Sequence, residues 1–73
     1  MSTAGHRPLS DDERAVLALV CDGLTNREIA ARLGSREALV AGIVSRLLKE
    51  LGLRNRVQLA VWAALHGLYP PQR

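Results

Sequence analysis

The side chains that can carry out chemistry are few in this sequence, and they lie far apart. Cys21 is the only cysteine, and His6 and His66 stand near opposite ends of the chain, so no group of ligands has the spacing of a zinc site. Residues 11–13 form an acidic run, but no nucleophile, base and orienting group can be assembled around it. We therefore expect a protein that is not an enzyme and that needs no metal or cofactor.

The charged residues point instead to a binding surface. The chain carries 10 Lys and Arg against 7 Asp and Glu, a formal net charge of +3. Acidic residues outnumber basic ones over 10–22, whereas cations gather over 24–56, namely Arg27, Arg32, Arg36, Arg46, Lys49, Arg54 and Arg56. Such a basic stretch suits a polyanion or an acidic membrane surface, although a small soluble protein can carry the same excess without any partner.

Capping residues and glycines divide the chain into four short predicted helices. The capping pairs are Ser10 with Glu13, Thr25 with Glu28 and Asn55 with Gln58. Ser35 can cap the remaining helix. These signals place helices from about 11 to 22, from the cap at 25 to 33, from the cap at 35 to 51, and from the cap at 55 to 67. Only 3% of the residues are aromatic, which favours an all-α fold over a sheet.

Length and end composition predict the domain organisation. A chain of 73 residues leaves room for one domain, which we place at 9–68 between a flexible arm (1–8) and a flexible tail (69–73). No run of 18 apolar residues and no signal peptide is present. We expect a cytoplasmic protein that does not enter a membrane.

The second and third predicted helices have the spacing of a helix-turn-helix, over about 25–44 and extending to 51. In that motif the second helix enters the major groove of DNA. Double-stranded DNA is then the expected partner. The same short turn with a glycine occurs in any small helical bundle, so the spacing alone leaves the function open.

Longer strings of the sequence resemble a known family. The string LSDDERAVLALVCDGLTNREIAARLG, continued by VSRLLKELGLRNRVQLAV, is similar to the DNA-binding effector domain of the LuxR family, also found at the carboxyl end of NarL and FixJ type response regulators. The likeness runs without a gap over 9–68. It implies four helices, a transcription regulator, and a fourth helix that serves as a dimer contact. Region 4 of sigma factors is a more distant likeness, sharing the first two strings but usually not LGLRNR.

The third helix departs from the family's pattern. Members usually show threonine, valine, lysine, any residue and histidine where this chain has Leu39, Val40, Ala41, Gly42 and Ile43. Only the valine, a core position, matches. Ala41 can touch only a thymine methyl group, and Gly42 costs about 1 kcal/mol of helix stability relative to alanine. The turn also departs at Ser35 and Arg36, and Glu50 replaces a usual lysine.

These departures shape the expected interface. The expected DNA-side residues are Thr25, Asn26, Arg27, Arg36, Ala38, Ala41, Gly42, Ser45, Arg46, Lys49, Arg54, Asn55 and Arg56. They support salt-dependent phosphate contacts, with base readout resting largely on Arg36 or Arg46, so we expect low specificity. In the alternative, the motif is degenerate and binds another protein through Leu39 and Ile43, which lie one turn apart. Both side chains can also simply turn inward and enlarge the core.

The apolar stripes predict which side chains are buried. In the second helix these are Ile29, Ala30 and Leu33. The fourth helix is apolar nearly all round, more than one packed stripe requires. Ala60, Val61 and Ala64 can face the core, and the surplus predicts a weak homodimer through Val57, Val61, Trp62 and Leu65. Packing accounts for Cys21 better than reactivity, because Asp22 is adjacent, and His66 suits the carboxyl end of a helix.

Overall fold

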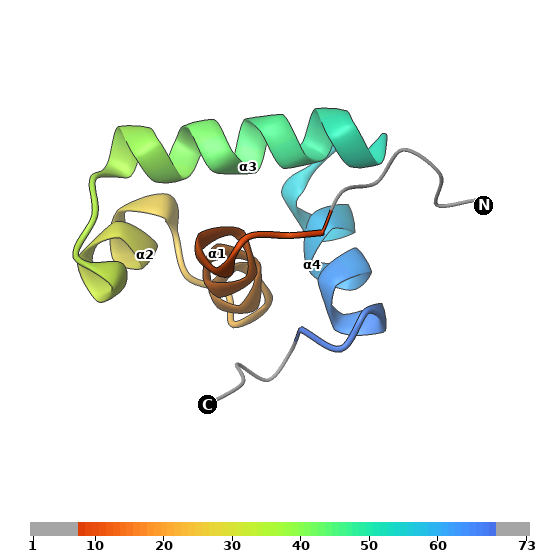
Figure 1. Cartoon of the computed structure of the whole chain (residues 1–73), viewed down its shortest axis with the longest axis horizontal. Coiled ribbons are helices and arrows are strands. Elements are labelled where there is room, and N and C mark those ends of the chain that lie inside the picture. The colour runs from red at the N-terminus through yellow and green to blue at the C-terminus, as the bar shows by residue number, and fades with distance from the viewer. Residues whose placement is uncertain (1–7, 69–73) are drawn as a thin grey trace.

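The computed structural model describes residues 8–68 and contains four helices with no strand in that range. They are α1 (Asp11–Cys21), α2 (Asn26–Leu33), α3 (Glu37–Leu51) and α4 (Arg56–Leu65) (Figure 1). The prediction of an all-α fold with a helix-turn-helix at the second and third helices is confirmed. The predicted tail, and the predicted arm except Pro8, lie outside the described residues.

The first two helices begin as their capping pairs predict. The Ser10 hydroxyl accepts a hydrogen bond from the Glu13 amide at 3.1 Å, and the Glu13 carboxylate accepts one from the Ser10 amide at 2.9 Å. Thr25 and Glu28 form the same reciprocal pair at the start of α2. Each pair satisfies two backbone donors that the first turn of a helix leaves without a partner.

The other two helix starts differ from the prediction. Ser35 does not cap α3, because that helix begins one residue later, with Arg36 at the N-cap and no side-chain capping bond. Asn55 does cap α4 by accepting from the Gln58 amide at 2.9 Å. The Gln58 side chain, however, accepts from the Arg54 amide at 2.8 Å, so this pair is not reciprocal.

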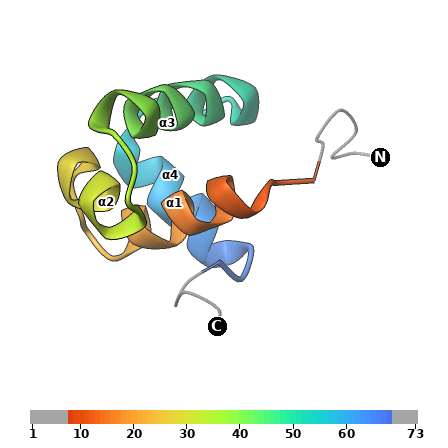
Figure 2. The same ribbon diagram turned by 60° about the vertical axis from the view of Figure 1, so that its left-hand side comes forward.

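The core forms where α1 packs along α4 and where α3 packs across α2 and α1. Both views show α3 lying over the other helices (Figure 1, Figure 2). The fully buried large side chains are Val16, Leu17, Ile29, Val40, Leu47 and Leu59. Every helix contributes to this set, and α3 contributes Val40 and Leu47 from its inward side.

Two expectations about burial are wrong. Leu33 is 39% exposed, because α2 ends there and the chain turns away at Gly34, which has a left-handed φ of 65°. On α4, Val61 and Ala64 are exposed, and the buried positions are Leu59 and Ala63. These two lie one turn apart on the side of α4 that meets α1.

The cysteine and the histidine have structural contacts. The Cys21 thiol donates to the Ala60 carbonyl at 3.2 Å, and burial raises the pKa of this thiol, which keeps it protonated at neutral pH. His66 follows α4 and stacks on Trp62 with ring centroids 4.0 Å apart. Packing therefore accounts for both residues.

Candidate nucleic-acid interface

One long side of α3 is free of the rest of the domain. The helix has 15 residues, which corresponds to a length of about 22 Å. Its inward row, Val40, Val44 and Leu47, is buried against the other helices. The opposite side faces away from the other helices, as the position of α3 in Figures 1 and 2 shows. A helix presented in this way has the shape that enters a major groove.

The outward row of α3 consists of Ala38, Gly42, Ser45 and Lys49. These residues follow one another at intervals of four, three and four, and all are exposed, so they share one face of the helix. Gly42 stands at its centre, and a Cβ atom added there would meet nothing within 4 Å. Internal packing therefore does not require a glycine at this position. Ala41 lies at the edge of the row and is half-buried.

The turn between α2 and α3 is short and held by backbone bonds. Gly34 takes the left-handed conformation that ends α2, and the Ser35 amide donates to the Ala30 carbonyl at 2.8 Å. Arg36 follows as the extended N-cap residue of α3, and its side chain is exposed. Residues 34–36 thus set the direction of α3 relative to α2, with Arg36 immediately before the first residue of α3.

The beginnings of α2 and α4 are joined by hydrogen bonds, and we name this region the α2–α4 corner. The Arg56 guanidinium donates to the Asn26 side-chain oxygen at 2.7 Å and to the Leu24 carbonyl at 2.6 Å. Thr25 and Asn55 cap the two helices at the same corner. These four side chains, which were expected at the interface, therefore make contacts that stabilise the starts of α2 and α4. The exposed side chains of Arg27 and Arg54 stand next to them in sequence.

Arg46 is tied to the first helix. Its Nη2 donates to Oε2 of Glu13 at 3.0 Å; the Glu13 side chain is 3% exposed and that of Arg46 is 52% exposed. The guanidinium compensates a carboxylate that burial would otherwise penalise. Sequence reasoning missed this pair, because the capping role of Glu13 accounted for the carboxylate and no local spacing links positions 33 residues apart.

The apolar residues expected at a docking patch on α3 or at a dimer interface on α4 differ in their exposure. Leu39 is 52% exposed, whereas Ile43 is half-buried against the core, so the expectation that both turn inward is wrong for Leu39. On α4, Val57, Val61 and Leu65 are exposed at intervals of one turn. Trp62 is half-buried and packs against the core, so only part of it is available at the α4 surface.

These features define a helix-turn-helix domain, and comparison with known proteins gives its family. The model of the bacterial regulatory proteins, luxR family, matches residues 7–63. The chain belongs to the LuxR family of bacterial regulatory proteins.

Its relatives include several regulators. The chain is 49% identical over 55 residues to the DNA-binding transcriptional activator DevR/DosR of Mycobacterium tuberculosis, which is 75% of this chain and 25% of that protein. It is 43% identical over 54 residues to the nitrate/nitrite response regulator protein NarL of Escherichia coli, 74% of this chain and 25% of that protein. The chain thus spans about a quarter of the length of these relatives.

Proposed function

We propose that this chain is the DNA-binding effector unit of a transcription regulator, with residues 9–68 as the binding domain and α3 as the helix that enters the major groove. The observation that carries the proposal is the outward row of α3, which is exposed along the helix while the opposite row is buried. Family membership supports the same function. A regulator of this kind acts on the chromosome, so the proposal implies a cytoplasmic protein.

Phosphate contacts supply most of the affinity in this proposal. Arg36 stands at the start of α3, Lys49 near its end, and Arg27 and Arg54 by the corner that Arg56 holds together; these four side chains are exposed. Cations spread in this way can contact the backbone on both sides of a groove, and each phosphate neutralised adds to the salt dependence.

Base readout is limited by the side chains of the outward row. Ala38 and Gly42 carry no hydrogen-bonding groups, and Ser45 can pair with more than one base. Arg36 and Arg46 are the arginines on or beside α3, and Arg46 already donates to Glu13. The isolated domain is therefore expected to discriminate weakly between sequences, because phosphate contacts carry little sequence information.

We also propose a weak homodimer through α4. Val57, Val61 and Leu65 are 71%, 52% and 79% exposed and lie on one face of the helix, so pairing with the same face of a second copy would remove them from water. Such a dimer would bind two half-sites about one helical turn of DNA apart.

A titration against random-sequence duplex DNA at two salt concentrations tests the proposed function. The wild-type affinity should fall steeply with salt, and Lys49→Ala should weaken binding and reduce the salt slope by about 1. Arg14→Ala is the matched control, because Arg14 is exposed on α1, away from the outward row. Absence of binding at low salt, or an equal effect of both substitutions, would contradict the proposal.

A further inference from the structure

Two hollows meet at Leu33 on the side of the domain where α1 faces the turn and α2. The smaller one, which we name the turn hollow, has a volume of about 240 Å³ and is bordered by Asp12, Leu33, Leu39 and Ile43. The larger one, the α1–α2 hollow, has a volume of about 350 Å³ and is bordered by Leu19, Leu33 and Leu68 with Arg14 and Arg32. Because Leu33 borders both, the two hollows are neighbours, and we name them together the Leu33 groove.

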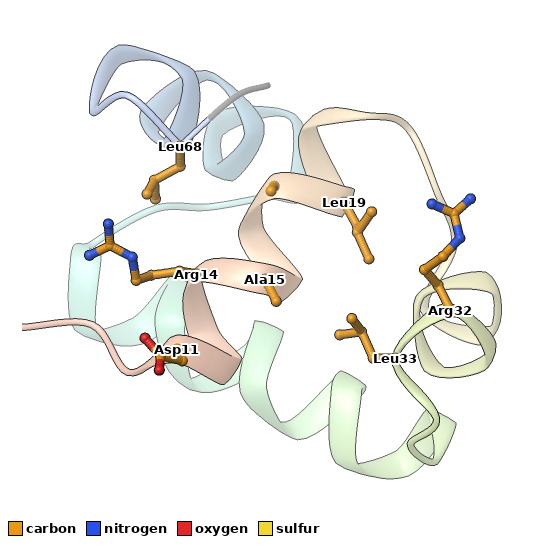
Figure 3. A pocket seen from close by; sticks show the side chains of 8 residues that line it. Asp11, Arg14, Ala15, Leu19, Arg32, Leu33 and Leu68 are labelled. Atoms are coloured by element: carbon orange, nitrogen blue, oxygen red, sulfur yellow. The ribbon is translucent and has the colours of Figure 1, made fainter. Parts of the chain in front are cut away.

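The Leu33 groove leaves large apolar side chains in water. Leu33 is 39% exposed and Leu39 is 52% exposed, although they belong to different helices. Figure 3 shows Leu19 and Leu33 pointing toward one another across the α1–α2 hollow. Covering the two hollows would remove this apolar surface from water, which favours binding. Each hollow can hold one apolar side chain of an occupant.

The charges along the groove are not uniform. Among residues 8–68, Asp12 is the one charged residue that borders the turn hollow. At the α1–α2 hollow, Arg14 and Leu68 lie at the end away from Arg32, and Asp11 lies at the same end as Arg14 (Figure 3). The turn hollow therefore has a negative border at Asp12, whereas the border of the α1–α2 hollow carries two arginines, Arg14 and Arg32, against one carboxylate, Asp11.

We propose that the Leu33 groove binds a segment of another protein that carries two apolar side chains, a basic residue beside the first and an acidic residue beside the second. The first apolar side chain enters the turn hollow with its basic neighbour at Asp12. The second enters the α1–α2 hollow with its acidic neighbour at Arg32. This surface and its partner go beyond the proposed DNA function and do not depend on it.

The chemistry of the groove distinguishes this occupant from two others. DNA fits the turn hollow poorly, because Asp12 repels phosphates and the side chains of Leu33, Leu39 and Ile43 offer them no donors. A second copy pressed groove to groove would leave both hollows unfilled, since two concave surfaces do not fill each other. The exposed apolar row of α4 belongs to the separate surface formed by Val57, Val61 and Leu65.

Peptide selection tests the proposal. The whole 73-residue protein is immobilised, and peptides are selected from a random displayed library. The enriched peptides should contain two apolar residues, with a Lys or Arg next to one and an Asp or Glu next to the other. Leu39→Ser and Asp12→Lys should each lower the affinity of the protein for the best synthetic peptide by about tenfold or more. Asp12→Asn replaces Asp12→Lys if circular dichroism shows that the latter is unfolded.

A control variant and an exchange of charge test whether the selected peptide binds at the Leu33 groove. Val57→Ser removes an apolar side chain on α4 that is more exposed than Leu39 and should leave peptide affinity within about twofold, well under 1 kcal/mol. A peptide whose basic residue is replaced by Glu should bind Asp12→Lys more tightly than it binds the wild type. Three results would overturn the proposal: no enriched peptide, peptides that bind Leu39→Ser as well as wild type, or sedimentation showing self-association that Leu39→Ser abolishes. No DNA is present, so failure here is distinct from failure to bind DNA.

Discussion

The start of α1 and the outward row of α3 both consist of polar or small side chains. Contacts inside the domain account for those at the start of α1 but not for those of the outward row. Ser10 and Glu13 make contacts inside the domain, in capping α1 and in pairing Glu13 with Arg46. Along α3, Ala38 and Gly42 are exposed and Gly42 has open space around it. Internal contacts therefore account for polar side chains at the start of α1, whereas internal packing does not require the glycine at the centre of the outward row.

Arg46→Ala should have the largest effect on stability among the changes that probe this difference. It leaves the buried Glu13 carboxylate without this guanidinium, and we expect a loss of about 2 kcal/mol in the free energy of unfolding, less than for a fully buried pair because Arg46 is half exposed. Urea denaturation measures it. Arg36→Ala, at an exposed position without a side-chain cap bond, is the control and should change stability by less than about 0.5 kcal/mol. Equal effects would remove the distinction between the two regions.

Ser10→Ala should come next. The substitution removes the hydroxyl that accepts from the Glu13 amide, at a cost of about 1 kcal/mol in unfolding free energy. Ser35→Ala is its matched control, because Ser35 does not cap α3. A loss as large for Ser35→Ala would show that the capping assignment at α3 is wrong.

Gly42→Ala should act in the opposite direction. A Cβ atom meets no neighbour at this position, so the alanine should raise the free energy of unfolding by about 0.5–1 kcal/mol through helix propensity alone. Thermal and urea denaturation measure the gain. A loss of stability would mean that the fold does require glycine, and the outward row would no longer contrast with α1.

Val61→Ser should have the smallest effect on the monomer. The side chain is 52% exposed, so unfolding free energy at low concentration should change by less than about 0.5 kcal/mol. Sedimentation at high concentration should nevertheless show weaker self-association than for the wild type. A wild-type chain that stays monomeric at millimolar concentration would contradict the proposed dimer.

Local signals predicted most of the fold. The apolar spacing and two capping pairs placed α1 and α2 within a residue or two, because those interactions act over three or four positions. The start of α3 was predicted too early. Ser35 is a residue type that commonly caps helices, but it does not stand at the N-cap position of α3. The burial of Leu33 was predicted wrongly because it depends on where α2 ends and turns away. The burial of Val61 was predicted wrongly because tertiary packing decides which side of α4 meets α1.

The candidate site was less accessible to sequence reasoning. The sequence identified the residues of the outward row, but it gave no reason to separate Arg56, which holds a corner, from Arg54, whose side chain is exposed. The pairing of Arg46 with Glu13 and the meeting of two hollows at Leu33 join different helices. Contacts between distant positions carry no local pattern in a single sequence, so they required the structure.

Amide chemical-shift mapping with random-sequence duplex DNA shows directly whether the outward row of α3 contacts DNA. The largest shifts on adding DNA should fall on the outward row of α3, at Ala38, Gly42 and Ser45, and at the start of α2 around Arg27. Salt should reverse these shifts, because phosphate contacts weaken as counterions compete. Shifts confined to α1 or to the α4 surface, with the outward row unchanged at saturating DNA, would contradict the proposed function.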